Sequence, residues 1–298
     1  MNLVISTSKL QSLYLENSDN LIVVDARPYS EYVAGHLPTA VNIDLAQFHW
    51  IDTSREGISQ FNKQMKILIS NIGITKRKFV VFYDDTSGIS SARGVWLLTY
   101  FSHNKTAMLD GGFSKWKRES LEIETGSNSF FHSNFDGKPN RHVLAGYAYI
   151  SSKIKKRLNS NNVVILDSRS KSEYMGYAVR AARGGHIPTA INVDWNDNIK
   201  KDGTFKEEKE LEKLYSHIPK DKEVITYCQG GYRAANTFIV LRNMGYSKVR
   251  MYVGSWGEWG NKLDLPVERL PSNARKKKRF SALQHQLISS NQKNYDIN

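Results

Sequence analysis

Cysteine is nearly absent from this chain of 298 residues, since it occurs once, as Cys228. A single thiol excludes an intramolecular disulfide and a cysteine-rich zinc site, and it fits a reducing compartment. Proline occurs only seven times, and no long polar tract interrupts the body, so the composition is not that of a disordered protein. No run approaches the roughly 18 consecutive apolar residues that a transmembrane helix needs.

A secretory signal is also missing, because the first residues, MNLVISTSKL, do not place a long apolar run after a basic segment. We therefore expect a cytoplasmic protein with no membrane partner. Negative charge is scarce, since the formal net charge is +13. Residues 271–298 carry six basic residues and one acidic residue, a net of +5 that leaves +8 for the rest. A basic body suits an anionic substrate.

The predicted tail over 271–298 contains the basic run RKKKR at 275–279. Aromatic residues are not interleaved with the run, and no nucleic-acid-binding motif accompanies it. We interpret it as a solvated tail rather than a segment that binds nucleic acid or membrane.

The chain contains one unit twice. Residues 23–44 and 165–194 both contain D-x-R, then S-E-Y, then G-H-[LI]-P-T-A-[VI]-N-[IV]-D, with eight extra residues in the second copy between Tyr174 and Gly185. Further along, VVFYDD (80–85) matches VITYCQ (224–229), and MLDGGFSKW (108–116) matches MYVGSWGEW (251–259). We predict domains over 1–125 and 148–270, joined by a polar linker over 126–147.

Short apolar runs alternate with helical patterns in each copy. The runs at 21–26, 79–85, 162–168 and 223–229 fit buried parallel strands, and those at 40–44 and 190–194 fit shorter ones. Segments 89–101 and 232–245 have helical spacing, and Gly245 ends the second one. The alternation predicts an α/β fold of two tandem domains, each a parallel sheet flanked by helices on both faces.

The two copies differ at the end of the strand that precedes these helices. Copy one has Asp84 there and copy two has Cys228. The carboxyl ends of parallel strands are where α/β folds place their sites. Because a carboxylate cannot do thiol chemistry, we predict that copy one is inactive and that copy two is the catalytic domain.

The loop that begins with Cys228 reads CQGGYR. Adjacent glycines allow a tight turn that points N–H groups at one spot beside a helix N-terminus, which favours a thiolate. A thiolate can attack a sulfur donor and keep the sulfur as an anionic persulfide. The alternative is that Cys228 is only a small buried hydrophobe. We predict Cys228 as the catalytic residue, and as its substrate-binding loop Gln229, Gly230, Gly231, Tyr232 and Arg233, the last with a donor fork suited to an oxyanion.

Motifs along residues 5–270 resemble those of the rhodanese superfamily, in its bacterial-type tandem thiosulfate sulfurtransferases. They are D-x-R with G-H-[LI]-P-x-A in each copy, D-G-G-F-x-x-W at 110–116, and G-S-W-G-E-W-G-N-x-x-D-x-P-V-E at 254–268. The resemblance implies that Cys228 forms the persulfide, that Asp84 marks the inactive copy, and that the loop 228–233 binds the transferred sulfur.

The loop also bears on the substrate. Phosphatases of this fold carry a seven-residue C-x-x-x-x-x-R loop, whereas the six residues here suit a persulfide better than a phosphoryl group. Mercaptopyruvate-specific relatives carry a C-G-[ST]-G-x-T type of loop, so Arg233 favours the dianion thiosulfate. Eukaryotic-type enzymes have arginine where Glu173 stands. We therefore predict sulfur transfer from thiosulfate to cyanide, a thiol or a protein. The alternatives are a 3-mercaptopyruvate sulfurtransferase and a persulfide carrier for a partner protein.

Several other polar residues occur in both copies. Asp25 with Arg27 and Asp167 with Arg169 follow buried strands, and we interpret both pairs as structural, with Arg169 as a substrate-binding candidate because it lies in the active copy. The histidines of the two G-H-[LI]-P motifs, His36 and His186, are interpreted as turn residues rather than acid–base catalysts. We interpret Trp256 as a packing residue, with a place in the cleft near Cys228 as the alternative. No ligand spacing or nucleotide fingerprint occurs, so we expect no metal and no cofactor.

Overall fold

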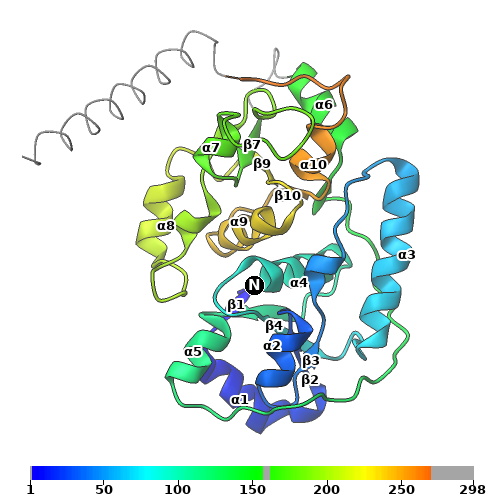
Figure 1. Ribbon diagram of the computed structural model, residues 1–298, viewed down its shortest axis with the longest axis vertical. Helices are drawn as coiled ribbons and strands as arrows, with labels where there is room; N and C mark the ends of the chain where they lie inside the picture. The colour runs from blue at the N-terminus through cyan, green and yellow to red at the C-terminus, as the bar shows by residue number, and fades with distance from the viewer. Residues whose placement is uncertain (1, 157–161, 270–298) are drawn as a thin grey trace, which may run out of the picture.

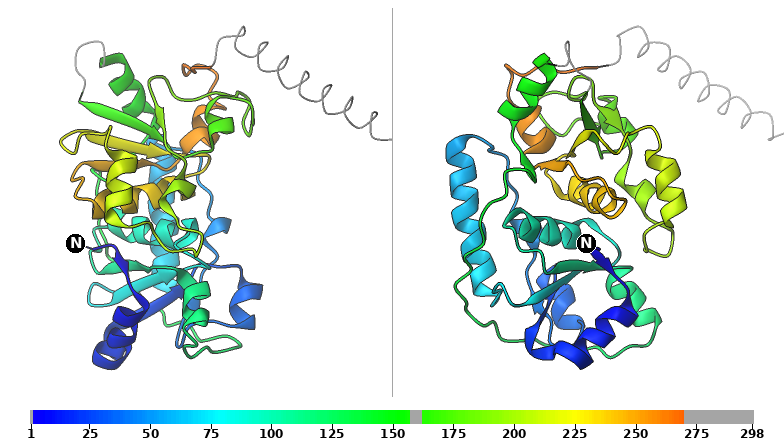
Figure 2. Two further views of the ribbon diagram at one scale, coloured as in Figure 1. Left: turned by 90° about the vertical axis from the view of Figure 1, so that its left-hand side faces the viewer. Right: turned by 180° about the vertical axis from the view of Figure 1, so that it is seen from behind.

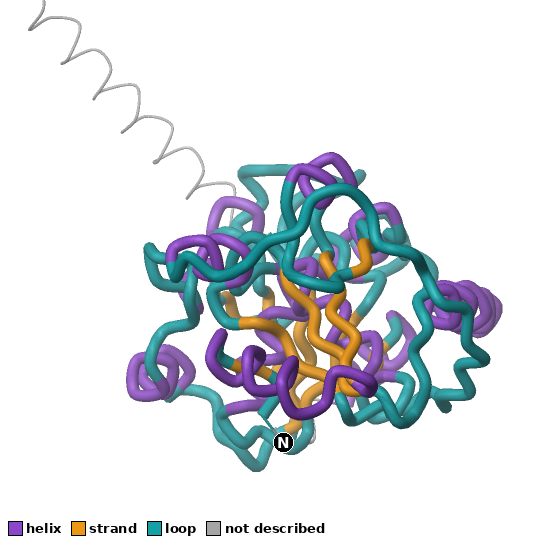
Figure 3. The backbone as a smooth tube through the Cα atoms, turned by 90° about the horizontal axis from the view of Figure 1, so that it is seen from below, coloured by secondary structure: helices purple, strands orange, loops and turns teal. Residues whose placement is uncertain are grey.

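The protein contains two parallel five-stranded sheets, one in each sequence copy. A computed structural model describes residues 2–156 and 162–269, and the predicted tail over 271–298 lies outside the described residues. The first sheet has the strand order β1-β5-β4-β2-β3 and the second has the matching order β6-β10-β9-β7-β8. Figure 3 shows the strands surrounded by helices, as the alternating pattern predicts. The predicted fold class is therefore confirmed.

The first sheet is built from short apolar strands, as the pattern of residues 21–26 and 79–85 predicts. Its elements, with two 3-10 helices η1 and η2, are β1 (Val4–Ile5), α1 (Thr7–Asn17), η1 (Ser18–Asn20), β2 (Leu21–Asp25), α2 (Tyr29–Ala34), β3 (Val41–Asn42), η2 (Leu45–Gln47), α3 (Arg55–Asn71), β4 (Phe79–Tyr83), α4 (Ile89–Tyr100), β5 (Thr106–Leu109) and α5 (Gly112–Arg118).

The second sheet repeats this order. Its elements are β6 (Leu144–Ala145), α6 (Tyr147–Lys156), β7 (Val163–Asp167), α7 (Lys171–Tyr174), β8 (Ile191–Asn192), η3 (Trp195–Asn198), α8 (Glu208–Tyr215), β9 (Glu223–Tyr227), α9 (Tyr232–Asn243), β10 (Val249–Tyr252) and α10 (Ser255–Trp259). Helix α9 has the same length as its counterpart α4. Gly245 follows α9 with a φ of +86°, the left-handed conformation predicted for a helix end.

The central strands of each sheet end together, which gathers polar residues at one edge. In the second sheet Asp167, at the end of β7, lies opposite Tyr227, at the end of β9. In the first sheet Asp25 lies opposite Tyr83 in the same way. The residue that follows each of these tyrosines is the one that differs between the copies.

Helices α4 and α9 pack against each other between the two sheets (Figure 1), and the view from behind in Figure 2 shows the same arrangement. The position explains why both helices are apolar around most of their surface. Residues 234–241 of α9 are all buried, and so are residues 91–98 of α4. One continuous hydrophobic core runs through both domains. A buried, apolar interface of this kind holds the two domains in one relative position.

Hydrogen bonds add polar contacts to this domain interface. The carboxylate of Glu258, on α10, accepts from the backbone N–H of Thr53 at 2.8 Å and from its hydroxyl at 2.6 Å. Phe205 donates its backbone N–H to Asp110 at 2.9 Å. The predicted domain limits at 125 and 148 stay predictions. Within the part of the chain that the structure describes, no helix is both long and apolar enough to span a bilayer.

Candidate functional site

Cys228 is the first residue after β9, and its side chain is buried at 1% exposure. Its Sγ accepts the backbone N–H of Gly231 at 3.1 Å. The backbone of Cys228 is held by the turn after β10, because its N–H donates to Ser255 Oγ at 3.1 Å and its carbonyl accepts from Trp256 N–H at 2.9 Å. The thiol is thus fixed between the end of a strand and the start of α9.

The two loop glycines are needed for different reasons. Gly231 immediately precedes α9 with a φ of +87°, in the region that favours glycine. Gly230 lies against His49 of the first domain, and a Cβ atom at this position would be 1.8 Å from the ring carbon Cε1. Gly231 therefore allows the turn that directs its N–H toward the thiol, and Gly230 allows the first domain to approach the loop closely.

Arg233 forms a bidentate ion pair with Glu173. The two nitrogen–oxygen distances are 2.6 Å and 3.0 Å. The sequence predicted that this guanidinium offers its donor fork to a substrate oxyanion, and in the structure a carboxylate occupies that fork. An anion would have to displace Glu173 to take its place. The substrate-binding role of Arg233 stays a prediction.

The Arg233–Glu173 pair gives a pH dependence that can be measured. Burial alone would raise the pKa of Glu173, but the hydrogen bonds and charge of Arg233, together with Ser170, lower it from 4.5 to about 2. A carboxyl whose pKa is lowered by folding stabilises the protein above its unfolded value and loses that contribution as the pH falls. The stabilisation is therefore complete above pH 4.5 and lost between there and pH 2.

We expect Glu173→Gln to be less stable than the wild type at about pH 6, and the gap in the free energy of unfolding to narrow at about pH 3, by on the order of 1–2 kcal/mol. Urea unfolding of both proteins at the two pH values measures this. Glu212→Gln is the control, since Glu212 pairs with Lys220 on the surface with both side chains about half exposed. A gap that stays constant between the two pH values would contradict the role of the pair.

Arg169 is buried at 1% exposure and is held through Nε and Nη2. It donates to both oxygens of Asp167, at 2.6 Å from Nη2, and to the carbonyl of Gly185 at 2.7 Å. In copy one, Arg27 makes the same contacts with Asp25 and Gly35 at the same distances. The repeated geometry supports the structural interpretation of both pairs. A substrate-binding role for Arg169 stays a prediction.

The two remaining loop side chains form hydrogen bonds with groups outside the loop. Gln229 donates from Nε2 to the carbonyl of Arg180, in the segment that copy one lacks, at 2.9 Å. The hydroxyl of Tyr232 donates across the domain interface to the carbonyl of Leu45 at 2.7 Å. Their roles as substrate-binding residues stay predictions. Trp256 is buried at 1% exposure, with its ring against the Arg169 guanidinium at 4.6 Å, so it packs as expected.

Asp84 shows what the equivalent loop of copy one does. Its buried carboxylate accepts three backbone N–H groups at 3.0–3.2 Å, from residues 88, 90 and 91 at the start of α4. Desolvation raises its pKa to about 6, and these N–H groups lower it only in part. The loop of copy one thus holds an anion of its own at the N-terminus of a helix.

Three residues near Cys228 were not predicted from the sequence. Ser255 fixes the backbone of Cys228 and has a φ of +50°, which is unusual outside glycine. His49 and Arg93 come from the first domain, and Arg93 Nη1 lies 3.0 Å from where a Cβ of Gly231 would be. The sequence shows Arg93 as the charged residue within the apolar segment 89–101. It does not show that Arg93 contacts the cysteine loop of the other domain.

The two motif histidines lie in isolated β-bridges, His36 with Glu124 and His186 with Glu268, and a turn follows each of them. His36 contacts the carbonyl of Tyr32 through Nδ1 at 3.0 Å and stacks on its ring, and His186 contacts the carbonyl of Tyr174 at 2.8 Å in the same way. Both rings are thereby held in place by the chain just before the G-H-[LI]-P motif. The predicted hydrogen bonds of both histidines are present, but each ring lies just before the turn rather than in it. The absence of an acid–base role stays a prediction.

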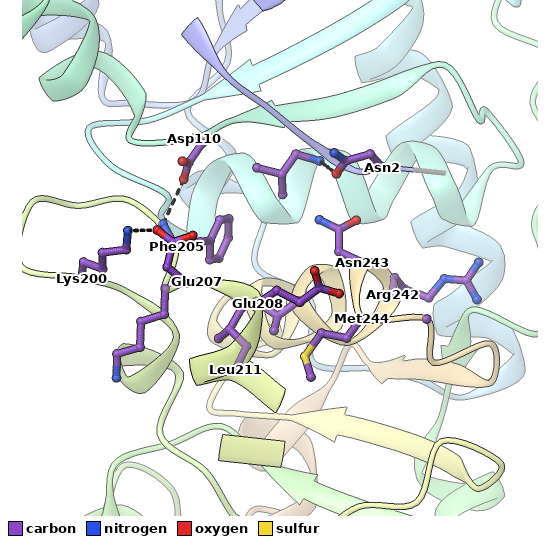
Figure 4. Close-up of a pocket in the computed structure, with 14 residues that line it drawn as sticks. Asn2, Asp110, Lys200, Phe205, Glu207, Glu208, Leu211, Arg242, Asn243 and Met244 are labelled. Atoms are coloured by element: carbon purple, nitrogen blue, oxygen red, sulfur yellow. Dashed lines mark hydrogen bonds and ion pairs between the residues drawn. The ribbon is translucent and has the colours of Figure 1, made fainter. Parts of the chain in front are cut away.

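A separate cavity of about 610 Å³ opens between the domains. Figure 4 shows that Lys200 pairs with Glu207 and that Asp110 accepts the Phe205 N–H. The residues that line it come from outside the loop 228–233. The cavity is therefore not part of the cysteine site.

Comparison with known proteins identifies the repeated unit. Residues 8–119 and 151–262 each match the family model described as a rhodanese-like domain. The chain is 32% identical over 276 residues to a thiosulfate sulfurtransferase of Azotobacter vinelandii, covering 89% of this chain and 97% of that one. It is 30% identical over 249 residues to the sulfur carrier protein TtuD of Thermus thermophilus, covering 80% and 87%.

A solved structure matches the same architecture. SseA of Escherichia coli, described as a 3-mercaptopyruvate sulfotransferase with a rhodanese fold, superimposes with a TM-score of 0.72 at 23% identity, covering 86% of this chain and 99% of that one. At that identity the likeness concerns the fold. The two family matches together span more than half of the sequence. The chain therefore belongs to the rhodanese family of sulfurtransferases, with two rhodanese-like domains in tandem.

Proposed function

We propose that the protein transfers sulfur from thiosulfate to a thiophilic acceptor through a persulfide on Cys228. The observation that carries the proposal is the buried Cys228 Sγ, which accepts the Gly231 N–H in a six-residue loop at the N-terminus of α9. A backbone donor and the positive end of a helix both favour negative charge on sulfur. The thiolate can therefore act as a nucleophile without a separate base.

The reaction proceeds in two displacements. The thiolate attacks the outer sulfur of thiosulfate, the sulfur–sulfur bond of the donor breaks, and sulfite leaves with the electron pair, so that Cys-S⁻ and S₂O₃²⁻ give Cys-S-S⁻ and SO₃²⁻. The acceptor then attacks the outer persulfide sulfur and the thiolate is restored. With cyanide the product is thiocyanate. In both steps the charge on the enzyme's sulfur stays at minus one, so one anion-binding loop serves the whole cycle.

The relatives support thiosulfate as the donor, because the Azotobacter vinelandii protein that covers nearly the whole chain is named for that substrate. The net charge of +13 favours anionic donors in general. We propose a thiol or a protein as the acceptor in the cell, in the cytoplasm, where free thiols persist.

A persulfide carrier is the second candidate. The relative from Thermus thermophilus is named as a sulfur carrier protein, and the 1% exposure of Cys228 would protect a bound persulfide from water. A carrier would accept sulfur from a partner protein and turn over slowly with free donors.

Steady-state assays distinguish these functions. We expect kcat/KM for thiocyanate formation to be higher with thiosulfate than with 3-mercaptopyruvate, because the dianion benefits more from the positive potential of the site. Both donors are tested against cyanide at the same ionic strength. A preference for mercaptopyruvate would reverse the assignment of the donor. If neither donor yields thiocyanate while a cysteine desulfurase still loads Cys228, the protein is a carrier.

A further inference from the structure

Arg93, in the middle of α4, is a buried cation without a counter-ion. Its side chain is 4% exposed, and within residues 2–156 and 162–269 its Nη1 has no hydrogen-bond partner and no carboxylate pairs with it. The guanidinium instead lies among aromatic rings, with its Cζ 4.6 Å from the ring centre of Trp96 and 5.4 Å from that of Tyr232. Burying an unpaired charge costs several kcal/mol, so the residue calls for an explanation other than stability.

The guanidinium lies against the cysteine loop of the other domain. Nη1 would be 3.0 Å from a Cβ atom at Gly231, and Gly231 is the residue whose N–H contacts Cys228 Sγ at 3.1 Å. Burial lowers the pKa of Arg93 to about 10, while the charges of Tyr232 and Cys228 act in the opposite direction. Arg93 therefore remains protonated at neutral pH, and the sulfur is a charge to which it responds.

The internal repeat gives an independent reason to expect that the fifth residue of α4 contacts the loop of the other domain. Arg93 is the fifth residue of α4, and Asn236 is the fifth residue of α9. Asn236 also crosses the interface, since its Nδ2 donates to the carbonyl of Ser87 at 2.8 Å, in the loop that begins with Asp84. Each helix thus sends the same position toward the loop of the other domain. The residue that faces the loop of Asp84, already an anion, is the neutral Asn236. The residue that faces the loop of Cys228 is the cation Arg93.

We propose that Arg93, supplied by the domain without the cysteine, is the cation that binds the negative charge on Cys228, first as the thiolate and then as the persulfide. The inference rests on the proposed function, since it assigns the counter-charge of the same sulfur. Against the effect of burial, the hydrogen bonds of Glu173 and the charge of Cys228 raise the pKa of Arg233. Arg233 is nevertheless a weaker candidate, because Glu173 occupies both of its outer nitrogens at 2.6 Å and 3.0 Å. The active site is then shared between the domains.

The first test measures the thiol itself and needs no sulfur donor. The rate at which iodoacetamide alkylates Cys228 is followed against pH in the wild type, Arg93→Met and Arg93→Lys. We expect the midpoint of this profile to move to higher pH by about one unit or more in Arg93→Met, and by less in Arg93→Lys. Arg118→Met is the matched control, because it removes one charge from an exposed residue of the same domain, and its midpoint should equal that of the wild type.

Tyr232 and Arg233 interact with the charge of Cys228, and His49 lies against Gly230 of the same loop. All three residues are kept in these variants. Burial and the charge of Arg93 lower the pKa of His49, so this ring is neutral across the alkaline range in which the shift is read. A change in midpoint confined to the two Arg93 variants therefore reports on Arg93 and the sulfur. An unchanged midpoint in Arg93→Met would overturn the proposal.

The second test separates a functional role from a structural one. Removing a structural arginine lowers stability, whereas removing an unpaired buried cation and replacing it with an apolar side chain of similar length is neutral or stabilising. We expect Arg93→Met to unfold at the same or a higher urea concentration than the wild type, while kcat/KM for thiocyanate formation falls about 100-fold. Lower stability with unchanged kcat/KM would show a packing role and overturn the proposal.

The two proposals fail separately. If thiosulfate does not load sulfur onto the wild type but the alkylation midpoint still moves in Arg93→Met, the donor is wrong and Arg93 remains the counter-charge of the thiolate. If the wild type loads sulfur and neither the midpoint nor kcat/KM responds to Arg93→Met, the proposed function stands and the role of Arg93 is refuted.

Discussion

Sulfur transfer is expected to disappear in Cys228→Ser, with a loss in kcat on the order of 10⁴-fold or more. A serine hydroxyl is not ionised near neutral pH, so it cannot attack the donor or carry a persulfide. The sequence has no second cysteine that could substitute for it. Intact-mass spectrometry after exposure to thiosulfate should show an adduct of about 32 Da, one sulfur atom, on the wild type and none on the variant.

Asp84→Ser is the matched control for this experiment, because it changes the residue at the same place in the other copy. It should still acquire the sulfur adduct, although the loop of copy one loses the carboxylate that receives three N–H groups. An adduct that persists in Cys228→Ser would contradict the persulfide mechanism. Unfolding curves for both variants distinguish a lost nucleophile from a lost fold.

Asp167→Asn is expected to lower the free energy of unfolding by about 3–5 kcal/mol, the cost of leaving a buried charge without its partner. The Arg169 guanidinium is 1% exposed and Asp167 is fully buried, so water cannot replace the lost carboxylate. Urea unfolding at neutral pH measures the change. The substitution keeps the shape of the side chain, so the effect reports on the charge and its hydrogen bonds rather than on a cavity.

Two further substitutions are controls for the effect of Asp167→Asn on stability. Asp25→Asn removes the same carboxylate from the same arrangement in copy one, where the distances to Arg27 are equal, and it should cost a similar amount. Asp136→Asn breaks the pair with Lys76 on the surface, where both side chains are more than half exposed, and it should change little. If Asp167→Asn behaves like the surface variant, the structural interpretation of the D-x-R motif is wrong.

The repeat made most of the fold predictable. The apolar runs and the two copies of the G-H-[LI]-P motif placed both sheets and the helices after them, because local pattern and burial agree in these segments. The comparison of Asp84 with Cys228 also located the site. The sequence did not predict which side chains the site residues contact. A single sequence could not reveal that Glu173 takes the fork of Arg233, since the two are 60 residues apart.

Arg93 was invisible for a similar reason. Its charge stands out within an apolar segment, but whether a charged residue in a helix faces water or a neighbouring domain depends on how the two sheets pack. The contact with the loop of Cys228 arises only because α4 lies against α9. Such a residue can be predicted from the chain once the repeat is treated as two halves that face each other, so that a position in one helix is compared with its equivalent in the other.

The equivalence of Arg93 and Asn236 has a consequence for any attempt to make both domains active. We expect that a cysteine introduced at position 84 would not give a second active site, because the helix facing that loop presents the amide of Asn236. The loop is also one residue longer, with five steps from Asp84 to the first residue of α4 against four from Cys228 to that of α9. The two domains therefore differ on both sides of the interface. A second active site would require changes in both domains, in the loop of copy one and in the helix that faces it.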